Sequence, residues 1–201
     1  MLKIPTKEYD RVDTVLSLFH KLERLSLNIV CVNRESFIDG YWLDHNRSFL
    51  SKLENLIDFR FDILSITSPN FMIKTSDDVL LTFQSDYWLK KGWSIGCFVN
   101  RIVIDTIENI AYYYCYVFTL PYQYKRFECV PQAFLNYKEN SFARQMVLDK
   151  WSNVRYLILD DRNYVAYSIE FFQFIKEKFI HLKILSIDDS STFEQQVISD
   201  R

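Results

Sequence analysis

Glycine is scarce in this sequence: 201 residues contain only Gly40, Gly92 and Gly96. Phosphate-binding turns are built on G-x-G-x-x-G or G-x-x-x-x-G-K-[ST], and these three positions cannot form either motif. The hydrolase nucleophile elbow, G-x-S-x-G, is missing as well. We therefore expect no enzyme here, with no cofactor and with no catalytic or metal-binding residues.

An excess of either charge is missing too, because 24 basic residues stand against 26 acidic ones and the formal net charge is -2. Nucleic acids and anionic membrane surfaces attract a broad positive field, so we expect neither as a partner. The longest uncharged stretch, residues 109–124, falls short of the roughly 20 apolar residues that a membrane-spanning helix needs. A soluble protein partner is the remaining expectation.

Cysteine is present, but not in a pattern that binds metal. Cys31, Cys97, Cys115 and Cys129 form no C-x-x-C pair, and the N-terminus shows no apolar region typical of a signal peptide. The pattern predicts reduced core thiols in a cytoplasmic or nuclear protein. A secreted framework with two disulfides is the alternative.

A nine-residue pattern of large apolar residues, Φ-x-x-Φ-x-x-Φ-x-Φ, occurs four times. The copies begin at Phe19, Leu53, Trp151 and Phe179, so the first two are 34 residues apart and the last two 28. The last three apolar positions of each copy fall on one side of a short strand, and the first closes the preceding helix. A helix–strand unit that recurs at such intervals is typical of a solenoid.

The periodicity predicts strands over residues 25–32, 59–66, 95–105, 111–120, 154–161 and 182–189. It predicts helices over 12–22, 49–57, 76–92 and 168–180, with Gly92 ending the third. We expect one α/β domain over 1–189, a leucine-rich-repeat-like solenoid with parallel strands on one face and helices on the other. The middle, about 70–145, is irregular, and 190–201 reads as a polar tail that is frayed or disordered.

Two segments, 151–161 and 179–189, resemble the leucine-rich repeats of F-box and related proteins, in which a helix ending in F-x-x-L runs into L-x-x-L-x-L. The stretch 25–61, with Phe37-Ile-Asp-Gly-Tyr-Trp-Leu43 inside it, resembles the repeat region of divergent invertebrate F-box families. The resemblance implies a scaffold that selects substrates for a ubiquitin ligase. The F-box itself is not recognisable, and Asp160 and Asp188 stand where the family usually has asparagine.

Residues between the strand leucines of such a repeat lie on the concave surface, where partners dock. The predicted partner-binding residues are Arg24, Asp58, Arg60, Tyr156, Ile158 and Ile184. Tyrosine and arginine are the usual interface anchors, which favours Tyr156, Arg24 and Arg60 among them. A solvated strand face without a partner is the alternative, and self-association through an uncapped N-terminal helix is a further expectation.

Two other functions fit the same sequence. A small Rossmann-like enzyme would use Asp160 and Asp188 at strand C-termini, where such sheets place ligands. A stoichiometric inhibitor of another protein would use any exposed face. Strand order separates a solenoid from a doubly wound sheet, because only the doubly wound sheet reverses its order at a switch point.

Overall fold

A computed structural model describes residues 2–3, 18–19, 21–34, 36–44, 49–67, 74–105, 110–145, 150–159 and 167–187. The strands are β1 (Leu2–Lys3), β2 (Arg24–Arg34), β3 (Asp58–Thr67), β4 (Ser94–Asp105), β5 (Ile110–Leu120), β6 (Arg126–Val130), β7 (Lys138–Glu139), β8 (Tyr156–Leu159) and β9 (Ile184–Ile187). The helices are α2 (Gly40–Asp44), α3 (Phe49–Lys52), α4 (Ser76–Leu81), α5 (Asp86–Lys91), α6 (Ser141–Gln145) and α7 (Ile169–Lys178), with 3-10 turns η2 (Thr82–Gln84) and η3 (Gln132–Asn136).

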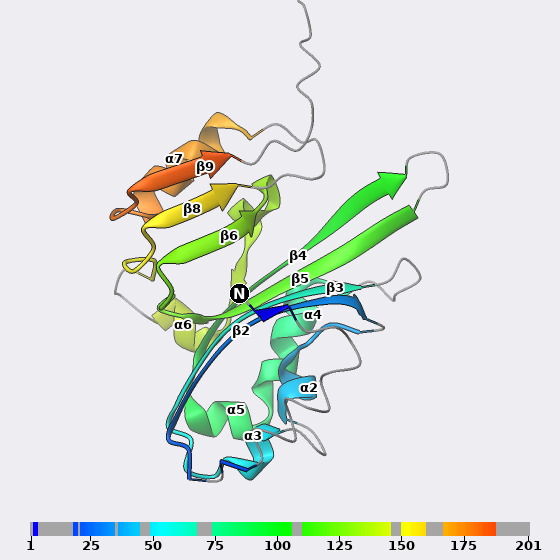
Figure 1. The fold of residues 1–201 in the computed structure, drawn as a ribbon, viewed down its shortest axis with the longest axis vertical. Helices are drawn as coiled ribbons and strands as arrows, with labels where there is room; N and C mark the ends of the chain where they lie inside the picture. Colours follow the sequence, from blue (N-terminus) through cyan, green and yellow to red (C-terminus); the bar gives the residue numbers. More distant parts are fainter. Residues whose placement is uncertain are drawn as a thin grey trace, which may run out of the picture.

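The strands form two sheets (Figure 1). The larger has six strands in the order β1-β2-β3-β5-β4-β7. Its first three strands are parallel, β5 is antiparallel to β3 and to β4, and β7 pairs antiparallel with β4. The smaller sheet has three parallel strands in the order β6-β8-β9. It lies on one side of the larger sheet, and helices α2 to α5 lie on the other.

The prediction of a leucine-rich-repeat-like solenoid is wrong, because the strands do not follow one another in parallel along one face. Neighbouring copies of the apolar pattern do pair: Leu25 lies opposite Phe59 in the larger sheet, and Leu157 opposite Leu185 in the smaller. Between these pairs the chain inserts the antiparallel hairpin of β4 and β5. A parallel pair needs a crossover of a dozen or more residues, and the connection between these two strands is far shorter. The mixed sheet also lacks the parallel, doubly wound order of the enzyme alternative.

The helix ends follow the local signals. Ser168 begins α7, and its side chain accepts a hydrogen bond from the backbone N–H of Phe171. Thr75 caps α4 in a reciprocal capping box with Asp78. Gly92 ends α5 at φ 63°, a left-handed conformation that favours glycine. The single predicted helix 76–92 is therefore helical throughout most of its length, but broken into α4, η2 and α5.

Other predicted elements differ or lie elsewhere. Helix α3 stops at Lys52, and Ile57, expected on its inward stripe, is 65 % exposed. Most of the predicted helix 12–22 lies outside the described residues, as does the tail 190–201. Within the described part, Leu18 and Phe19 are exposed.

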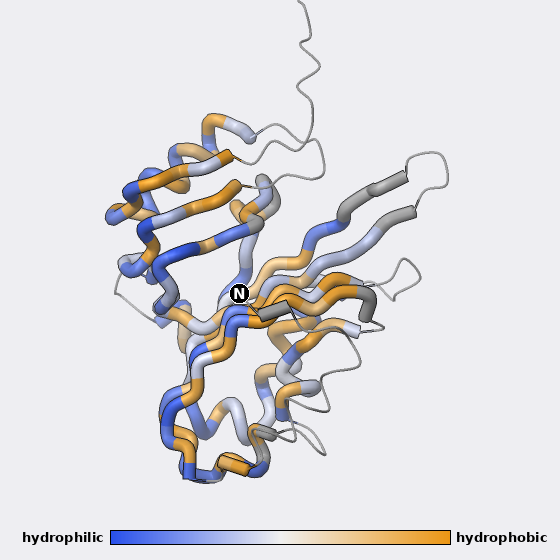
Figure 2. Tube along the Cα trace, in the orientation of Figure 1, coloured by the Kyte–Doolittle hydropathy of each residue, from blue (hydrophilic) through white to orange (hydrophobic). Residues whose placement is uncertain are grey.

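One hydrophobic core fills the space between the larger sheet and helices α2 to α5. Strand side chains that point to this side include Ile29, Phe59 and Phe61, which pack with Phe83 and Trp88 of η2 and α5. Alternation along β2 and β3 sends every second residue to this core, since side chains of a strand alternate between the faces of its sheet. Hydrophobic residues accordingly recur along the strands of the larger sheet and in the helices beside it (Figure 2).

A second core lies on the opposite face of the larger sheet. Phe98, Tyr116 and Phe118 of β4 and β5 pack there with Phe127 of β6 and with Trp151. The inward residues of the smaller sheet and the apolar side of α7 belong to the same cluster. The larger sheet is thus buried on both faces over residues 95–98 of β4 and 114–120 of β5, which explains the nearly uninterrupted apolar sequence of these stretches.

Candidate functional site

Three of the predicted contact residues lie together on the smaller sheet. Leu157 and Leu159 of β8 are buried, whereas Tyr156 is 42 % exposed and Ile158 is half-buried on the opposite face. Ile184 of β9 lies in register with Tyr156 and is 51 % exposed. We use "outer face" for the residues on this side of the smaller sheet, namely Arg126, Glu128, Tyr156, Ile158, Ile184 and Ser186.

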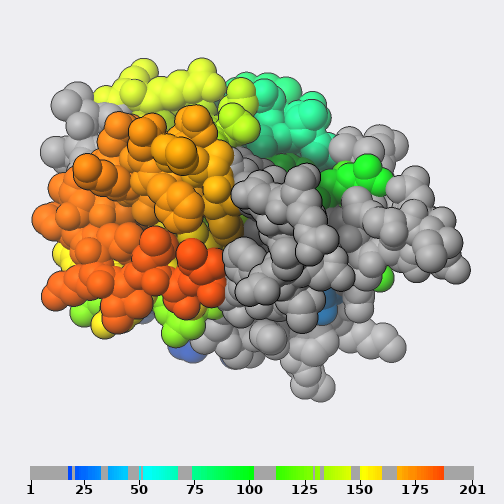
Figure 3. All heavy atoms as spheres, turned by 90° about the horizontal axis from the view of Figure 1, so that it is seen from above, coloured from blue at the N-terminus to red at the C-terminus, as the bar shows by residue number. Residues whose placement is uncertain are grey.

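Strand β9 forms an edge of the outer face. Among the described residues no strand pairs with its free side, and all four of its residues are exposed, including Leu185 and Ile187. Figure 3 shows β9 and α7 together forming one end of the molecule. An edge strand with free backbone groups and exposed apolar side chains is a template for pairing with another chain.

The other three predicted contact residues lie on the larger sheet, so the single concave surface that was expected for all six does not exist. Arg24 is exposed and lies in register with Asp58. Arg60 binds Asp58 through Nε and a terminal guanidinium nitrogen, at 2.9 and 2.8 Å, and it donates to Gln123 Oε1 at 2.9 Å. Asp58 and Arg60 are therefore engaged within the chain, near the segment that joins the two sheets.

That segment, residues 121–125, holds the smaller sheet against β2 and β3. Tyr122 is fully buried and donates a hydrogen bond to Asp62 Oδ2 at 2.6 Å. The hydroxyl of Tyr124 donates to the carbonyl of Leu27 at 2.9 Å and lies 2.9 Å from Ser26 Oγ. Phenols that span from one sheet to the other fix the relative position of the sheets through hydrogen bonds as well as packing.

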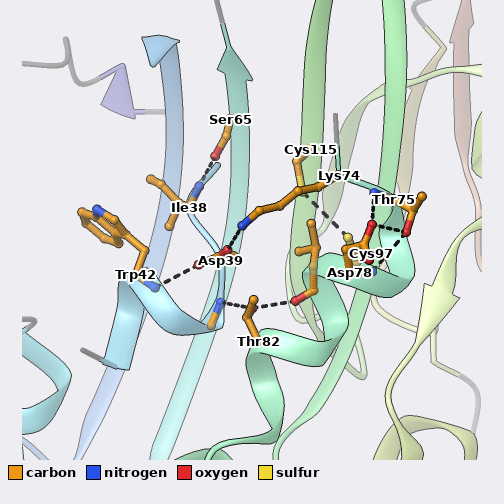
Figure 4. A network of polar contacts seen from close by, with 12 residues as sticks. Ile38, Asp39, Trp42, Ser65, Lys74, Thr75, Asp78, Thr82, Cys97 and Cys115 are labelled. Carbon is orange, nitrogen blue, oxygen red and sulfur yellow. Dashed lines mark hydrogen bonds and ion pairs between the residues drawn. The ribbon is translucent and has the colours of Figure 1, made fainter. Parts of the chain in front are cut away.

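Two carboxylates, Asp39 and Asp62, are buried, and they differ in how well they are satisfied. Asp39 Oδ1 accepts from the backbone N–H of Trp42, and Oδ2 pairs with Lys74 Nζ at 2.9 Å (Figure 4). The first bond caps α2, and the second neutralises the charge. Both carboxylate oxygens of Asp39 are therefore occupied by contacts within the chain.

The same network contains a pair of thiols (Figure 4). Cys97 and Cys115 are buried, with their sulfurs 3.8 Å apart, and neither of them nor Cys31 forms a disulfide. This confirms the prediction of reduced core thiols for these three cysteines; the side chain of Cys129 lies outside the description. Burial raises the pKa of the Cys115 thiol well above its ordinary value, which keeps it protonated and poorly nucleophilic.

Asp62, the second buried carboxylate, is only partly satisfied. It is 4 % exposed, and its Oδ2 accepts from Tyr122 and from Asn28 Nδ2 at 3.1 Å. Its other oxygen, Oδ1, is buried without a hydrogen-bond partner. Burial raises the pKa of Asp62 to about 6, against the lowering effect of its hydrogen bond from Tyr122.

Asp62 also lines a cavity of about 300 Å³ between the two sheets. The sequence analysis missed this residue, although a signal was present: Asp62 stands between Phe61 and Ile63 inside a strongly apolar strand. A charged residue in the middle of such a strand is rare unless it is paired or functional.

The two aspartates of the enzyme alternative, Asp160 and Asp188, lie outside the described residues. Tyr41 is 57 % exposed, whereas Trp42 packs partly against the first core. Within the described part of the chain, no group of three or more histidine, cysteine, aspartate or glutamate side chains has the arrangement of a metal site. No described helix is both long enough and apolar enough to cross a bilayer.

Comparison with known proteins finds no family model, curated protein or solved structure that matches the chain.

Proposed function

We propose that this protein is a non-enzymatic interaction module that binds a protein partner on the outer face of the smaller sheet. The observation that supports the proposal is the row of Tyr156 and Ile184, which lie in register and are about half exposed beside the free edge of β9. Exposed apolar side chains that gather at one place commonly mark an interaction surface. A partner strand that pairs with β9 would bring its side chains onto this face.

The residue types on this face suit such a role. Tyrosine brings a large apolar surface and a polar hydroxyl at a low cost in side-chain entropy, and it is enriched at interface hot spots. Arg126 and Glu128 of β6, which pair with each other, border the apolar row and supply a polar rim. An apolar centre with a charged border is the usual anatomy of a protein interface.

We propose further, from the resemblance of the chain to F-box repeat proteins, that the captured partner is a substrate of a ubiquitin ligase. This part of the proposal rests on residues 25–61, 151–161 and 179–189. Its test is a pull-down with the purified ligase adaptor protein. A chain that is not retained by the adaptor contradicts ligase recruitment by this chain and leaves the binding face untouched.

The binding face is tested with a double variant, Tyr156→Glu with Ile184→Glu. The matched control is Leu81→Glu with Leu89→Glu, because these side chains are 59 % and 48 % exposed on α4 and α5, on the far side of the larger sheet. Crosslinked partners should be captured by the wild type and by the control, and their affinity for the face variant should fall about tenfold or more. Equal binding by all three proteins would contradict the proposal.

A further inference from the structure

The cavity beside Asp62 lies where the two sheets meet. Its floor is formed by Asn28 and Val30 of β2 with Asp62 and Leu64 of β3, and Tyr116 of β5 closes one side. Its wall comes from the segment that enters β6, with Lys125, Arg126 and Glu128. The side chains of Asn28, Val30, Asp62, Leu64 and Tyr116 lie on the face of the larger sheet that carries the second core.

One buried oxygen atom at the cavity, Asp62 Oδ1, lacks a hydrogen-bond donor. This oxygen is buried and has no partner, whereas Oδ2 already accepts from Tyr122 and Asn28. An unsatisfied buried carboxylate oxygen is costly, and native structures retain such groups chiefly for a reason. A ligand that donates to Oδ1 would remove this cost.

The number of carboxylate oxygens without a partner indicates which kind of cationic group fits the cavity. A guanidinium presents two parallel N–H groups and is matched best by two carboxylate oxygens, but only one is free here. A primary ammonium is a compact donor that needs one strong acceptor and can place its other protons toward phenol oxygens or ring faces. Tyr116 and Tyr124, which line the same cavity, supply both.

The shape and rim of the cavity agree with an ammonium carried on an alkyl chain. Val30 and Leu64 offer an apolar path along which methylene groups can lie. Of the two cations at the rim, Arg126 is neutralised by its ion pair with Glu128, and Lys125 is exposed to solvent. Arg126 and Glu128 therefore cancel, the remaining rim charge is that of the solvent-exposed Lys125, and the buried charge of the site is that of Asp62.

We propose that this cavity binds the side-chain ammonium of a lysine carried by the protein partner, with Asp62 Oδ1 as its acceptor. This inference rests on the proposed function, because it needs a partner on the outer face. The two sites are continuous: Arg126, at the rim of the cavity, lies in register with Tyr156 on that face. A segment that lies along the outer face can therefore extend one long side chain into the cavity.

The test measures binding of small probes, so it does not depend on finding the partner. The probes are N-acetyl-lysine methylamide, its neutral counterpart N-acetyl-norleucine methylamide, and n-butylammonium. Each is titrated by calorimetry and by NMR chemical shifts into the wild type, Asp62→Asn, and Glu54→Gln as an exposed-carboxylate control. A fourth protein, Val30→Phe, fills the cavity and leaves the carboxyl in place.

We expect the lysine probe to bind the wild type and Glu54→Gln equally. Asp62→Asn should weaken binding about 10- to 100-fold, which is the range for a hydrogen bond to a charged group. Val30→Phe should abolish it, and the norleucine probe should not bind. Because the acceptor must be ionised, binding should be about tenfold weaker at pH 5 than at pH 7.5, since the pKa of Asp62 is about 6.

Three results would overturn the inference. Failure of both amines to bind means that the cavity holds water only. Equal binding of the lysine and norleucine probes, or unchanged binding to Asp62→Asn, means that the carboxyl does not recognise the ammonium. Binding of n-butylammonium without binding of the lysine probe means that the source is a free amine, not a partner's lysine. None of these results bears on partner capture by Tyr156 and Ile184, which is measured separately.

Discussion

Replacing Asp62 by asparagine should stabilise the protein at neutral and alkaline pH. The amide has nearly the shape of the carboxyl and can still accept hydrogen bonds from Tyr122 and Asn28, which both bind one oxygen of Asp62. It carries no charge. The substitution therefore removes the cost of a buried, incompletely paired carboxylate while keeping most of the surrounding contacts.

The size of the effect follows from the pKa of Asp62. Burial raises this pKa from 3.8 to about 6. A carboxyl whose pKa is raised by folding favours the folded state at low pH, and this contribution is lost as the pH rises through the folded-state pKa. At ~1.4 kcal/mol for each pKa unit, the full contribution of this group is about 3 kcal/mol, and the wild type should lose about 2 kcal/mol of it between pH 4 and pH 7, because the unfolded chain is already partly ionised at pH 4.

The assay is urea unfolding of the wild type and Asp62→Asn at several pH values from 4 to 8. The two proteins should differ least near pH 4, where Asp62 is neutral in the folded chain and only partly ionised in the unfolded chain. By pH 7 the variant should be about 2–3 kcal/mol more stable, which corresponds to a melting temperature higher by about 4–12 °C for a chain of this size. Glu54→Gln, at an exposed position, should follow the wild type.

The reasoning is refuted if the difference between Asp62→Asn and the wild type stays constant from pH 4 to pH 8. A difference that grows in the opposite direction would mean that the carboxylate has a cationic partner in the folded protein. Either result would also remove the main physical ground for the ammonium site.

Three other substitutions test the structural roles assigned above. Asp39→Asn should lower the unfolding free energy by about 1–3 kcal/mol, because Lys74 loses a charged partner at 2.9 Å; a gain in stability, as expected for Asp62→Asn, would contradict the contrast between the two carboxyls. Gly96→Ala should cost about 1–3 kcal/mol, because the added Cβ would lie 2.3 Å from a ring carbon of Phe118, and an unchanged denaturation midpoint would show that this ring moves freely. Thr75→Ala should cost about 1 kcal/mol through loss of the α4 cap; Thr75→Ser, which keeps the hydroxyl, should restore most of it in the same chemical-denaturation assay.

The sequence predicted four of the six strands of the larger sheet well, and it missed the two-residue strands β1 and β7. Residues 25–32 and 59–66 fall inside β2 and β3, and 95–105 and 111–120 coincide closely with β4 and β5. These segments are rich in β-branched and aromatic residues and are bounded by turns, which are local signals. The assignment of Tyr156, Ile158 and Ile184 to the exposed side of their strands also agrees with the burial pattern, since alternation along a strand is local too.

The topology was not predicted, because it depends on which distant strands meet. The apolar pattern correctly matched β2 with β3 and β8 with β9. It carried no information on whether these two pairs belong to the same sheet. The short connection between β4 and β5 was the decisive clue, because it permits only an antiparallel hairpin. That hairpin separates the two parallel units into different sheets.

The candidate site was only partly visible for a related reason. A residue's exposure to solvent can be predicted from alternation along a strand. Asp62 and Asn28, however, line a cavity whose other wall is formed about 60 residues later in the chain, by Tyr124 and the start of β6. Only the packing of the smaller sheet on the larger one turns this side of β3 from a surface into an interior. The same side of the strand at Arg60 remains partly exposed.

Stability and binding should therefore depend on Asp62 in opposite directions. Asp39 shows that this fold can bury a carboxylate with both oxygens bonded, through a helix cap and Lys74. At Asp62 the chain instead leaves one oxygen without a partner beside an open volume of about 300 Å³. Stabilising variants at functional sites commonly lose function, because the strained or unpaired group is the one that the ligand satisfies. If Asp62→Asn gains stability and loses affinity for the lysine probe, then the chain keeps a destabilising buried carboxylate because that carboxylate binds the ammonium.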